Sequence, residues 1–495
     1  MMLRNTFKPA KTPSDVKMHS LLLEALFLTF AHRKESGAMS LMVSISGIRG
    51  IVGETLTPET AVKYAAAYAE YSKRGTIILG RDGRVTGKNI GHIVSSTLLQ
   101  MGCDVVALGI CPTPTVALAV TSKKAAGGIS ITASHNPMQW NGLKFFASTG
   151  LFLDAEENRA LWAIADGTKP SYVPWDKQGK HFADPDFIDE HIKNVLSLPY
   201  IDAPAVRKRK FKVVVDCVNA GGAIIVPNLL RQLGCEVLEM YCKDSGIFPH
   251  TPEPLPENLT ELASRVRTEN ADLGIAVDPD ADRLVLINEK GESIGEEYTL
   301  ACVVDFVLGK QSKSPQGSKL PPVVVNLSTT RAIDDIASKY KVDLIRTAVG
   351  EINVAKKMKE VGAVIGGEGN GGVLLPASHI GRDALVGIGL LLQQLTEFGG
   401  TLSELKRSLP QYSIIKGKVD LGSLNPDRLL KNLAERYRGK AEVTTIDGLK
   451  LDFPTSWVHL RKSNTEPIIR IIAEAPGKSE ANDLVKQFTN EILSR

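Results

Sequence analysis

The sequence lacks three features that would place it in a special class of protein. Lysine and arginine exceed aspartate and glutamate by only four residues, 59 against 55, and so small an excess does not indicate a nucleic-acid-binding surface. No apolar run approaches the ~18 residues that a membrane-spanning helix needs. None of the six cysteines belongs to a Cys-x-x-Cys pair or has histidines at zinc-binding spacing. We therefore expect no nucleic-acid or membrane partner, and buried thiols in the reducing cytoplasm.

The beginning of the chain shows no pattern of a globular domain. The stretch from Leu21 to Ala31 is apolar but short, and Glu24 interrupts it. No convincing small-residue cleavage site follows, so we do not predict a signal peptide. The globular pattern begins near Met42, and we interpret residues 1–41 as a disordered or non-native extension.

The remaining chain is long enough for several domains. With 495 residues and a prior of ~150 residues per domain, three or four domains are expected. Hydrophobic residues make up 43% of the chain and charged residues 23%, which is ordinary for a soluble globular protein.

Three segments of the chain repeat one arrangement, a strand followed by a helix and two further strands. Their period of ~110–130 residues is longer than that of solenoid repeats. The apolar runs do not alternate with polar residues, which indicates strands covered on both faces, and their alternation with helices predicts α/β layers. The expected strands are 76–80, 104–108 and 128–131 in the first unit, 212–216, 236–240 and 273–277 in the second, and 323–326, 342–345 and 363–365 in the third.

The last part of the chain breaks this pattern. Shorter strands are expected at 416–421, 457–460 and 468–473, and an amphipathic helix at 479–493. We therefore predict an α/β protein with three similar mixed α/β domains and a smaller C-terminal α+β domain around one central cleft. The predicted domains are 42–190, 191–298, 299–411 and 412–495.

The loops after the three third strands carry much of the chemistry. They are Thr132–Pro137, Asp278–Arg283 and Gly367–Gly372. Ligands bind at the carboxyl ends of strands in open α/β sheets. If the units are equivalent, the three loops face the same cleft.

The first loop presents a serine, with donors of His135 and Asn136 beside it. Asn136-Pro137 makes a sharp turn after a buried strand, because proline fixes its own φ and restrains the preceding residue. Ser134 at the mouth of the sheet is a candidate nucleophile, and His135 a candidate catalytic neighbour. On this segment alone, an Asn-Pro turn with a capping serine explains the pattern equally well.

The second loop has the composition of a metal site. Asp278, Asp280 and Asp282 alternate and can direct three carboxylates at one hard cation such as Mg²⁺. An EF-hand is excluded because its sixth position, which requires glycine, would be Arg283. That arginine is instead well placed to hold a phosphate.

The third loop and a fourth one near the C-terminus are predicted to bind substrate. Gly367–Gly372 matches Gly-x-Gly-x-x-Gly but runs into another apolar stretch instead of a helix, so a dinucleotide site is a poor interpretation. Glu368 and Asn370 suit sugar hydroxyls better. A dense set of donors forms a candidate phosphate cradle: Arg461, Ser463, Asn464, Thr465 and Arg470.

Two further cations are candidates for the chemistry. Lys144 follows the serine loop on an expected strand at 143–146, where a lysine in neutral or positive surroundings can act in proton transfer. Arg49 lies in a glycine-flanked turn near the start of the first unit and could reach a phosphate on Ser134.

These four motifs, in this order, resemble the signatures of the α-D-phosphohexomutases, and the resemblance covers essentially everything after residue 42. It implies four domains around a cleft and a phosphoserine at Ser134. The phosphoserine would share Mg²⁺ with Asp278, Asp280 and Asp282 and donate its phosphoryl to a hexose monophosphate. A hexose 1,6-bisphosphate, also the activator, would return its other phosphate to the serine.

The resemblance also implies a role for each remaining candidate. Arg49, Lys144 and Arg283 would assist proton and phosphoryl transfer, Glu368 and Asn370 would hold sugar hydroxyls, and the phosphate cradle would hold the phosphate that is not transferred. A pure binding protein would need no nucleophile, but a phosphohydrolase and a non-catalytic phosphosugar-binding protein stay open.

The choice of sugar is less clear from the sequence. The cradle shares its Thr-Glu-Pro part with phosphoglucosamine mutases, whereas Asn464 and Thr132 are closer to phosphomanno- and phosphoglucomutases. The third loop lacks the Ser-Gly-His ending common in both and has Asn370-Gly371-Gly372, and Glu351 stands where many relatives place a histidine. We expect glucosamine phosphate to be preferred, with glucose and mannose phosphates as the alternative, in a monomer or homodimer.

Overall fold

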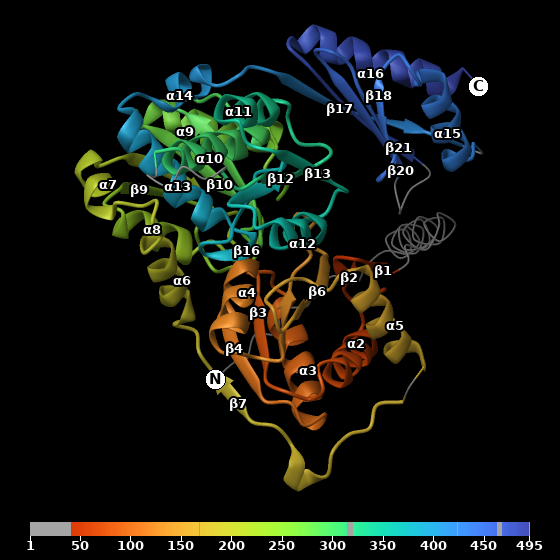
Figure 1. Ribbon diagram of the computed structural model, residues 1–495. Coiled ribbons are helices and arrows are strands. Elements are labelled where there is room, and N and C mark those ends of the chain that lie inside the picture. Colours follow the sequence, from red (N-terminus) through yellow and green to blue (C-terminus); the bar gives the residue numbers. More distant parts are fainter. Residues whose placement is uncertain (1–40, 168, 314–319, 423, 463–467, 495) are drawn as a thin grey trace, which may run out of the picture. The chain divides into compact units, whose positions relative to one another are not determined.

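The computed structural model describes residues 41–167, 169–313, 320–422, 424–462 and 468–494. All contacts reported below lie within residues 42–495. Nearly all of the proposed extension at residues 1–41 therefore lies outside the described residues. Four β-sheets follow one another along the chain (Figure 1), and each belongs to one domain.

The first sheet has seven strands in the order β1-β2-β6-β5-β3-β4-β7. Its strands are β1 (Met42–Ser44), β2 (Gly47–Ile51), β3 (Ile77–Arg81), β4 (Val105–Ile110), β5 (Gly127–Ile131), β6 (Trp140–Ala147) and β7 (His181–Ala183). Its helices are α2 (Pro58–Tyr71), α3 (Gly87–Gln100), α4 (Thr113–Ser122) and α5 (Ala155–Gly167), and α6 (Phe187–Leu196) and α7 (Ala203–Arg209) lead to the second domain.

The second and third sheets have four and five strands, in the orders β11-β10-β8-β9 and β13-β12-β14-β15-β16. The second domain contains β8 (Lys212–Asp216), α8 (Ile225–Gln232), β9 (Glu236–Met240), α9 (Thr260–Thr268), β10 (Leu273–Val277) and β11 (Leu284–Asn288). The third contains α10 (Glu296–Gln311), β12 (Val323–Asn326), α11 (Ala332–Tyr340), β13 (Leu344–Thr347), α12 (Glu351–Val361), β14 (Ile365–Glu368), β15 (Gly372–Leu375), β16 (His379–Arg382), α13 (Ala384–Phe398) and α14 (Leu402–Ser408).

The three domains share one topology, as the internal repeat predicts. In each, the first strand lies between the second and third, and all three are parallel. The expected repeat was incomplete, however. A helix (α4, α9 or α12) separates the second strand from the third, and a fourth, antiparallel strand (β6, β11 or β15) pairs with the third. The expected strands at 342–345 and 363–365 begin two residues later than predicted.

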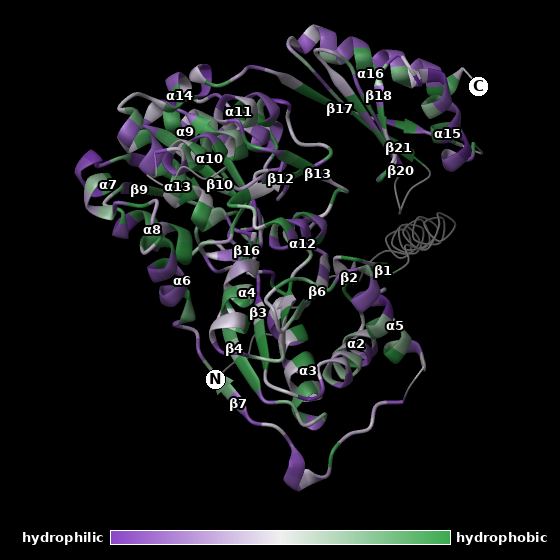
Figure 2. Cartoon of the chain, viewed as in Figure 1, coloured by the Kyte–Doolittle hydropathy of each residue, from purple (hydrophilic) through white to green (hydrophobic). Residues whose placement is uncertain are grey.

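Several strands are fully buried because helices cover both faces of their sheets. Every residue of β5, β10, β11 and β12 is buried, which is typical of covered strands with continuous apolar runs. Figure 2 shows the hydrophobic colour on strands such as β4 and β10. None of the helices in the described part of the chain combines the length and apolarity that crossing a lipid bilayer demands.

The second and third domains share one hydrophobic core. Helices α10 and α13 are buried along most of their length, and their side chains pack with those of both sheets in a single cluster. A helix that is apolar on nearly every side is expected only inside a core. This shared core fixes the loop after β10 against the loop after β14.

The fourth domain is a smaller α+β unit with its own core. All its strand pairs are antiparallel, in the order β17-β21-β20-β19-β18. The elements are β17 (Ser413–Asp420), α15 (Pro426–Tyr437), β18 (Glu442–Thr444), β19 (Leu449–Asp452), β20 (Trp457–Lys462), β21 (Ile468–Ala475) and α16 (Lys478–Leu493).

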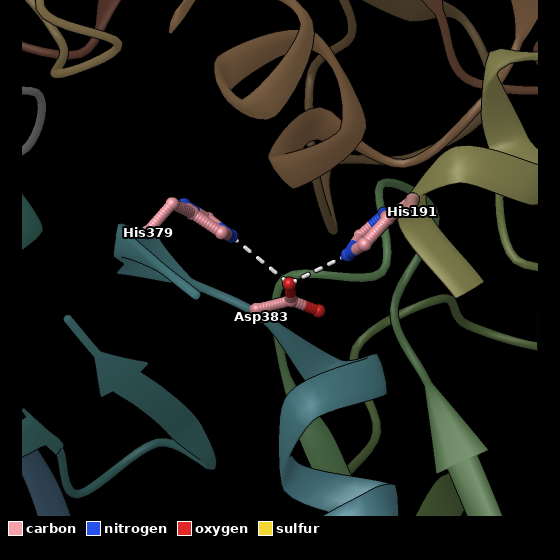
Figure 3. A group of neighbouring side chains, drawn as sticks. All are labelled: His191, His379 and Asp383. Carbon is pink, nitrogen blue, oxygen red and sulfur yellow. Dashed lines mark hydrogen bonds and ion pairs between the residues drawn. The ribbon is translucent and has the colours of Figure 1, made fainter. Parts of the chain in front are cut away.

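A buried carboxylate of the third domain binds His191 of α6 (Figure 3), which in turn contacts α4 of the first domain. Asp383 accepts hydrogen bonds from Nε2 of His191 at 2.8 Å and Nε2 of His379 at 2.9 Å. Its other oxygen caps α13 through the amides of Leu385 and Val386. The other ring nitrogen of His191 hydrogen-bonds the hydroxyl of Thr115 in α4 at 2.9 Å. The carboxylate is thus saturated by protein donors and does not need a metal.

Candidate active site

The serine loop holds Ser134 in a strained conformation. Its φ is +49°, a left-handed value that non-glycine residues seldom adopt. The amide of Ser134 donates to the hydroxyl of Thr132 at 2.9 Å, and that hydroxyl donates to Asp82 at 2.7 Å. Such strain persists only where the surroundings fix it, and it concentrates at functional sites. The conformation favours a functional serine over a simple turn.

Arg84 is the residue that fixes the serine loop, and the sequence analysis did not select it. Its side chain is fully buried and forms an ion pair with Asp82 at 3.0 Å. Its guanidinium also donates to four carbonyl oxygens at 2.5–3.0 Å, those of Ser134, Asn136, Pro137 and Trp140. A rigid, five-donor group suits this task. The position of the Asp82–Arg84 turn after the first strand was the available signal.

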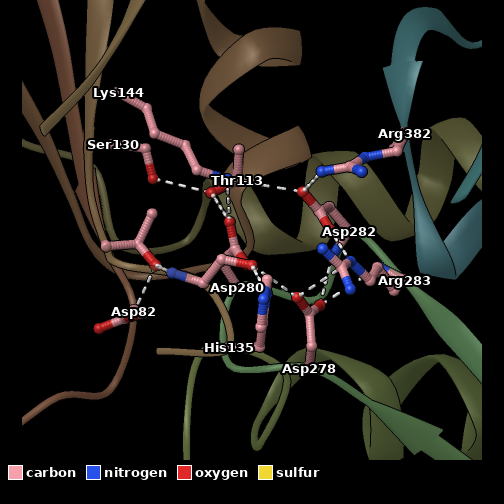
Figure 4. Close-up of polar contacts among 12 residues, drawn as sticks. Asp82, Thr113, Ser130, His135, Lys144, Asp278, Asp280, Asp282, Arg283 and Arg382 are labelled. Atoms are coloured by element: carbon pink, nitrogen blue, oxygen red, sulfur yellow. Dashed lines mark hydrogen bonds and ion pairs between the residues drawn. The ribbon is translucent and has the colours of Figure 1, made fainter. Parts of the chain in front are cut away.

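The three aspartates of the metal loop lie close to Lys144, Arg283 and Arg382 (Figure 4). Asp278, Asp280 and Asp282 are buried, and one oxygen of each lies within 4.8 Å of the others. The hydroxyl of Ser134 donates to Oδ2 of Asp278 at 3.0 Å. The serine loop and the aspartates, 144 residues apart in the chain, therefore meet as the repeat predicts.

Both oxygens of Asp278 are hydrogen-bonded to the protein, whereas Asp280 and Asp282 each have one oxygen bonded. Oδ1 of Asp278 accepts the amides of Asp282 and Arg283, both at 3.2 Å. Oδ2 of Asp280 accepts Lys144 at 2.6 Å and Thr113 at 2.8 Å. The remaining oxygens, Oδ1 of Asp280 and Oδ1 of Asp282, are buried without a hydrogen-bond partner in the described structure. Single oxygens presented this way fit a small divalent cation, and Mg²⁺ prefers such ligands.

The charges of the loop shift the pKa values of its carboxyls in opposite directions. Burial and then the neighbouring Asp282 and Asp280 raise the pKa of Asp278 well above its usual range. Burial also opposes ionisation of Asp280, but the ammonium of Lys144 and the hydroxyl of Thr113 outweigh it and hold its pKa below the usual range. A divalent cation would favour the ionised form of all three carboxyls.

Lys144 lies where the sequence places it, but its surroundings differ from the expectation. It extends from β6 and also lies 3.5 Å from Asp282. The expectation of neutral or positive surroundings is therefore wrong, because the nearest charges are carboxylates. Lys144 serves in this structure as the buried countercharge of Asp280.

His135, Arg49 and Arg283 surround the serine. Nδ1 of His135 lies 3.3 Å from the hydroxyl of Ser134. Burial, Arg283 and Arg49 lower the pKa of His135 to about 2, so its ring is neutral. Arg49 donates to the side chain of Asn136 at 3.2 Å. Nε of Arg283 is buried, has no hydrogen bond to any described residue, and lies 3.9 Å from both Asp278 and Asp282.

The loop predicted to bind sugar contacts the metal loop. Glu368 accepts the side chain of Asn326 at 2.8 Å and the amide of Gly350 at 3.0 Å, and Oδ1 of Asn370 is buried without a partner among the described residues. The carbonyl of Gly371 accepts the amide of Leu284 at 3.0 Å.

Arg382 reaches the same place from β16 and was missed by the sequence analysis. Its guanidinium pairs with Asp282 at 2.5 Å, Glu368 at 2.8 Å and Glu351 at 3.1 Å. Burial raises the pKa of Glu351, and the charge of Arg382 lowers it. The effect of burial is the larger, and the pKa is raised to about 7. No motif in the sequence marks Arg382, which becomes apparent only when β14, β15 and β16 pair.

The phosphate cradle is described only in part. Arg461 and Arg470 are directly opposite on β20 and β21, and Arg461 forms an ion pair with Asp447 at 3.0 Å. Asp447 also accepts the amide of Val349 at 2.9 Å, next to the Gly350 amide that binds Glu368. The cradle residues Ser463, Asn464 and Thr465 lie outside the described residues.

Comparison with known proteins identifies the family. Four models match the chain in order: phosphoglucomutase/phosphomannomutase alpha/beta/alpha domains I, II and III, at residues 41–171, 189–291 and 296–412, and the C-terminal domain at 419–491. The chain belongs to the phosphoglucomutase/phosphomannomutase family. Members of this family are phosphohexomutases, intramolecular phosphotransferases of the isomerase class, and the chain is such an enzyme.

The relatives bear two names. A "probable phosphoglucosamine mutase" of Methanopyrus kandleri is 37% identical over 450 residues, 90% of this chain and 96% of the relative. A "phosphoglucomutase/phosphomannomutase" of Thermococcus kodakarensis is 35% identical over 455 residues, 90% and 97%. A crystal structure of a phosphoglucomutase/phosphomannomutase family protein from Burkholderia thailandensis aligns with a TM-score of 0.78 at 25% identity, covering 92% of this chain and 98% of that one. The predicted phosphohexomutase family is confirmed.

Proposed function

We propose that this phosphohexomutase interconverts glucosamine 6-phosphate and glucosamine 1-phosphate through a phosphoserine at Ser134. The observation that carries this proposal is the strained, buried serine, whose hydroxyl donates to Asp278 at 3.0 Å. The name of the Methanopyrus relative favours the amino sugar. The Thermococcus relative favours the alternative, glucose and mannose phosphates. The domains would run over 42–190, 191–298, 299–411 and 412–495.

The donor set supports Mg²⁺ as the metal. Asp278, Asp280 and Asp282, together with the serine oxygen, would hold it, since two of the aspartates carry a buried oxygen that has no hydrogen-bond partner among the described residues. When bound, the ion would neutralise charge on the phosphoryl group in transfer.

The residues around Ser134 would carry out the transfer. The sugar hydroxyl attacks phosphorus, the bond between phosphorus and the serine oxygen breaks, and the hydroxyl proton leaves to a nearby base. A hexose 1,6-bisphosphate, which is also the activator, results. The serine oxygen then attacks its other phosphorus, the bond from that phosphorus to the sugar oxygen breaks, and the sugar oxygen takes up a proton. Arg49 and Arg283 would neutralise the transferring phosphoryl group. Lys144 would exchange a proton with the substrate oxygen.

His135 would orient the serine. Because the Ser134 proton is donated to Asp278, Nδ1 of His135 would donate a hydrogen bond to the serine oxygen.

Residues of the third and fourth domains would hold the sugar and its second phosphate. Glu368 and Asn370 are proposed to bind ring hydroxyls. The phosphate that is not transferred would lie in the cradle, formed by Arg461, Ser463, Asn464, Thr465 and Arg470. The six cysteines are free thiols, which supports a place in the reducing cytoplasm. We propose a monomer or homodimer.

The substrate is tested by a ranking of rates. The purified protein, with Mg²⁺ and a trace of hexose 1,6-bisphosphate, is given glucosamine, glucose or mannose 1-phosphate, and each 6-phosphate and free phosphate is followed. Fastest isomerisation of the glucosamine ester, abolished in Ser134→Ala, is expected. A faster glucose or mannose ester would support the alternative, and free phosphate without isomerisation would indicate a hydrolase.

A further inference from the structure

Arg382 joins three carboxylates that come from different parts of the chain. Asp282 follows β10, Glu351 begins α12, and Glu368 ends β14. All three lie within 3.1 Å of the guanidinium, and the amide of Arg382 also donates to Glu351 at 3.0 Å. Burial opposes the charge of Arg382, but these carboxylates raise its pKa well above the usual range. It is therefore a permanent cation at the junction of the metal loop and the sugar loop.

The path of this side chain depends on Gly372. A Cβ atom at Gly372 would lie 2.2 Å from Cδ and 2.9 Å from Cγ of Arg382, closer than atoms can approach. The stem of the arginine thus passes directly over the glycine that starts β15. Any larger residue at this position would displace the guanidinium from the three carboxylates.

We propose that Arg382 is a positioning residue that sets how Asp282 is offered to the metal and that holds Glu351 and Glu368 in place for the sugar. Arg382 occupies Oδ2 of Asp282, while Oδ1 is buried and has no hydrogen bond within the part of the chain that the structure describes. The arginine therefore leaves Asp282 one oxygen for a cation and competes for its charge. The role of Arg382 in holding Glu351 and Glu368 for the sugar rests on the proposed function, whereas its role toward the cation does not.

Removal of the guanidinium affects the two ligands in opposite directions. Without it, Oδ2 of Asp282 keeps only the more distant Lys144 at 3.5 Å and one positive charge is lost, so Mg²⁺ binds more tightly. At the same time Glu351 and Glu368 lose their shared partner, and the added negative charge repels a phosphosugar. If Arg382 had only a structural role, its removal would weaken the binding of both Mg²⁺ and the phosphosugar, or of neither.

The test uses the full-length protein and the variants Arg382→Gln and Arg382→Lys. In calorimetric titration with Mg²⁺ alone, we expect Arg382→Gln to bind about tenfold more tightly, the scale of one unit charge close to a carboxylate. With the preferred hexose phosphate, KM should rise by about tenfold or more, and kcat should fall less. Arg382→Lys should show smaller changes, because one ammonium cannot bridge three carboxylates.

Two further variants make the result decisive. Gly372→Ala displaces the same arginine without removing it and should raise KM in the same direction. The control is Arg231→Gln, an exposed arginine of α8 that pairs with Glu239, and both constants should stay at the wild-type values. Unchanged or weaker Mg²⁺ binding in a folded Arg382→Gln protein would overturn the proposal, as would an unchanged KM in Gly372→Ala. Because the Mg²⁺ titration needs no turnover, an inactive wild type would count against the proposed function alone.

Discussion

At the scale of single residues, the site is built from charges that satisfy one another before any ligand arrives. Lys144 and Arg382 occupy one oxygen each of Asp280 and Asp282. A buried carboxylate whose partner is removed costs about 3–5 kcal/mol. The protein therefore fixes one oxygen of each of these two carboxylates with an internal cation and leaves the other oxygen for a ligand.

Lys144→Met tests this arrangement. The substitution leaves Asp280 without its countercharge, so we expect the thermal midpoint of the protein in EDTA to fall clearly. Excess Mg²⁺ should recover part of the loss, because the cation neutralises the same carboxylate. Scanning calorimetry under both conditions measures the effect. An equal loss with and without Mg²⁺ would contradict it, and Lys193→Met, from an exposed pair with Glu190, should have little effect.

At the scale of elements, a single arginine holds the serine loop in its strained shape. Arg84→Lys keeps the charge but cannot donate to four carbonyls and Asp82 at once. We expect kcat to fall about 100-fold, the scale of a misplaced reacting group. Mg²⁺ affinity should fall less, because the three aspartates have no described bond to Arg84. Steady-state kinetics and calorimetry measure the two quantities. A kcat close to that of the wild type would contradict the assigned role.

The sequence predicted the elements well where the signal is local. The valine-rich strands β8 and β12, and β10, the third strand of the second unit, match their expected bounds. Each is an apolar run of consecutive residues between turns, which can be recognised in the sequence itself. Arg84 and Arg382 were missed because their importance arises from pairing between distant strands. The sequence showed that Gly372 stands where many relatives have histidine. It did not show that the side chain of Arg382 passes over this glycine.

At the scale of the whole molecule, short polar contacts join the domains. The main-chain amide of Thr113, in the first domain, donates to the carbonyl of Asp280 at 2.9 Å. In the contact between the third and fourth domains, His459 is fully buried and bonds Ser328 at 2.8 Å and the carbonyl of Asp447 at 2.7 Å. These contacts bring loops from separate sheets together, which no local sequence pattern specifies.

His459 gives this contact a predictable dependence on pH. Burial lowers its pKa to about 4, whereas an unfolded histidine titrates near 6.5. Below pH ~6.5 the unfolded chain binds a proton at this histidine that the folded protein does not bind. The free energy of unfolding therefore falls as the pH falls toward 4, and the effect levels off there. The loss attributable to His459 should be about 2 kcal/mol between pH 7 and pH 5. His459→Gln should reduce the decrease in thermal midpoint over this range, and an unchanged decrease would contradict the assignment.

The central claim is that Ser134 carries the phosphoryl group between the two ends of the sugar. The most direct measurement follows ³²P from protein labelled with a hexose 1,6-bisphosphate to unlabelled glucosamine 6-phosphate in the presence of Mg²⁺. We predict label on Ser134, its transfer to the sugar bisphosphate and monophosphates, and no labelling of Ser134→Ala. Label that appears only as free phosphate, or that is carried equally well by Ser134→Ala, would contradict the account.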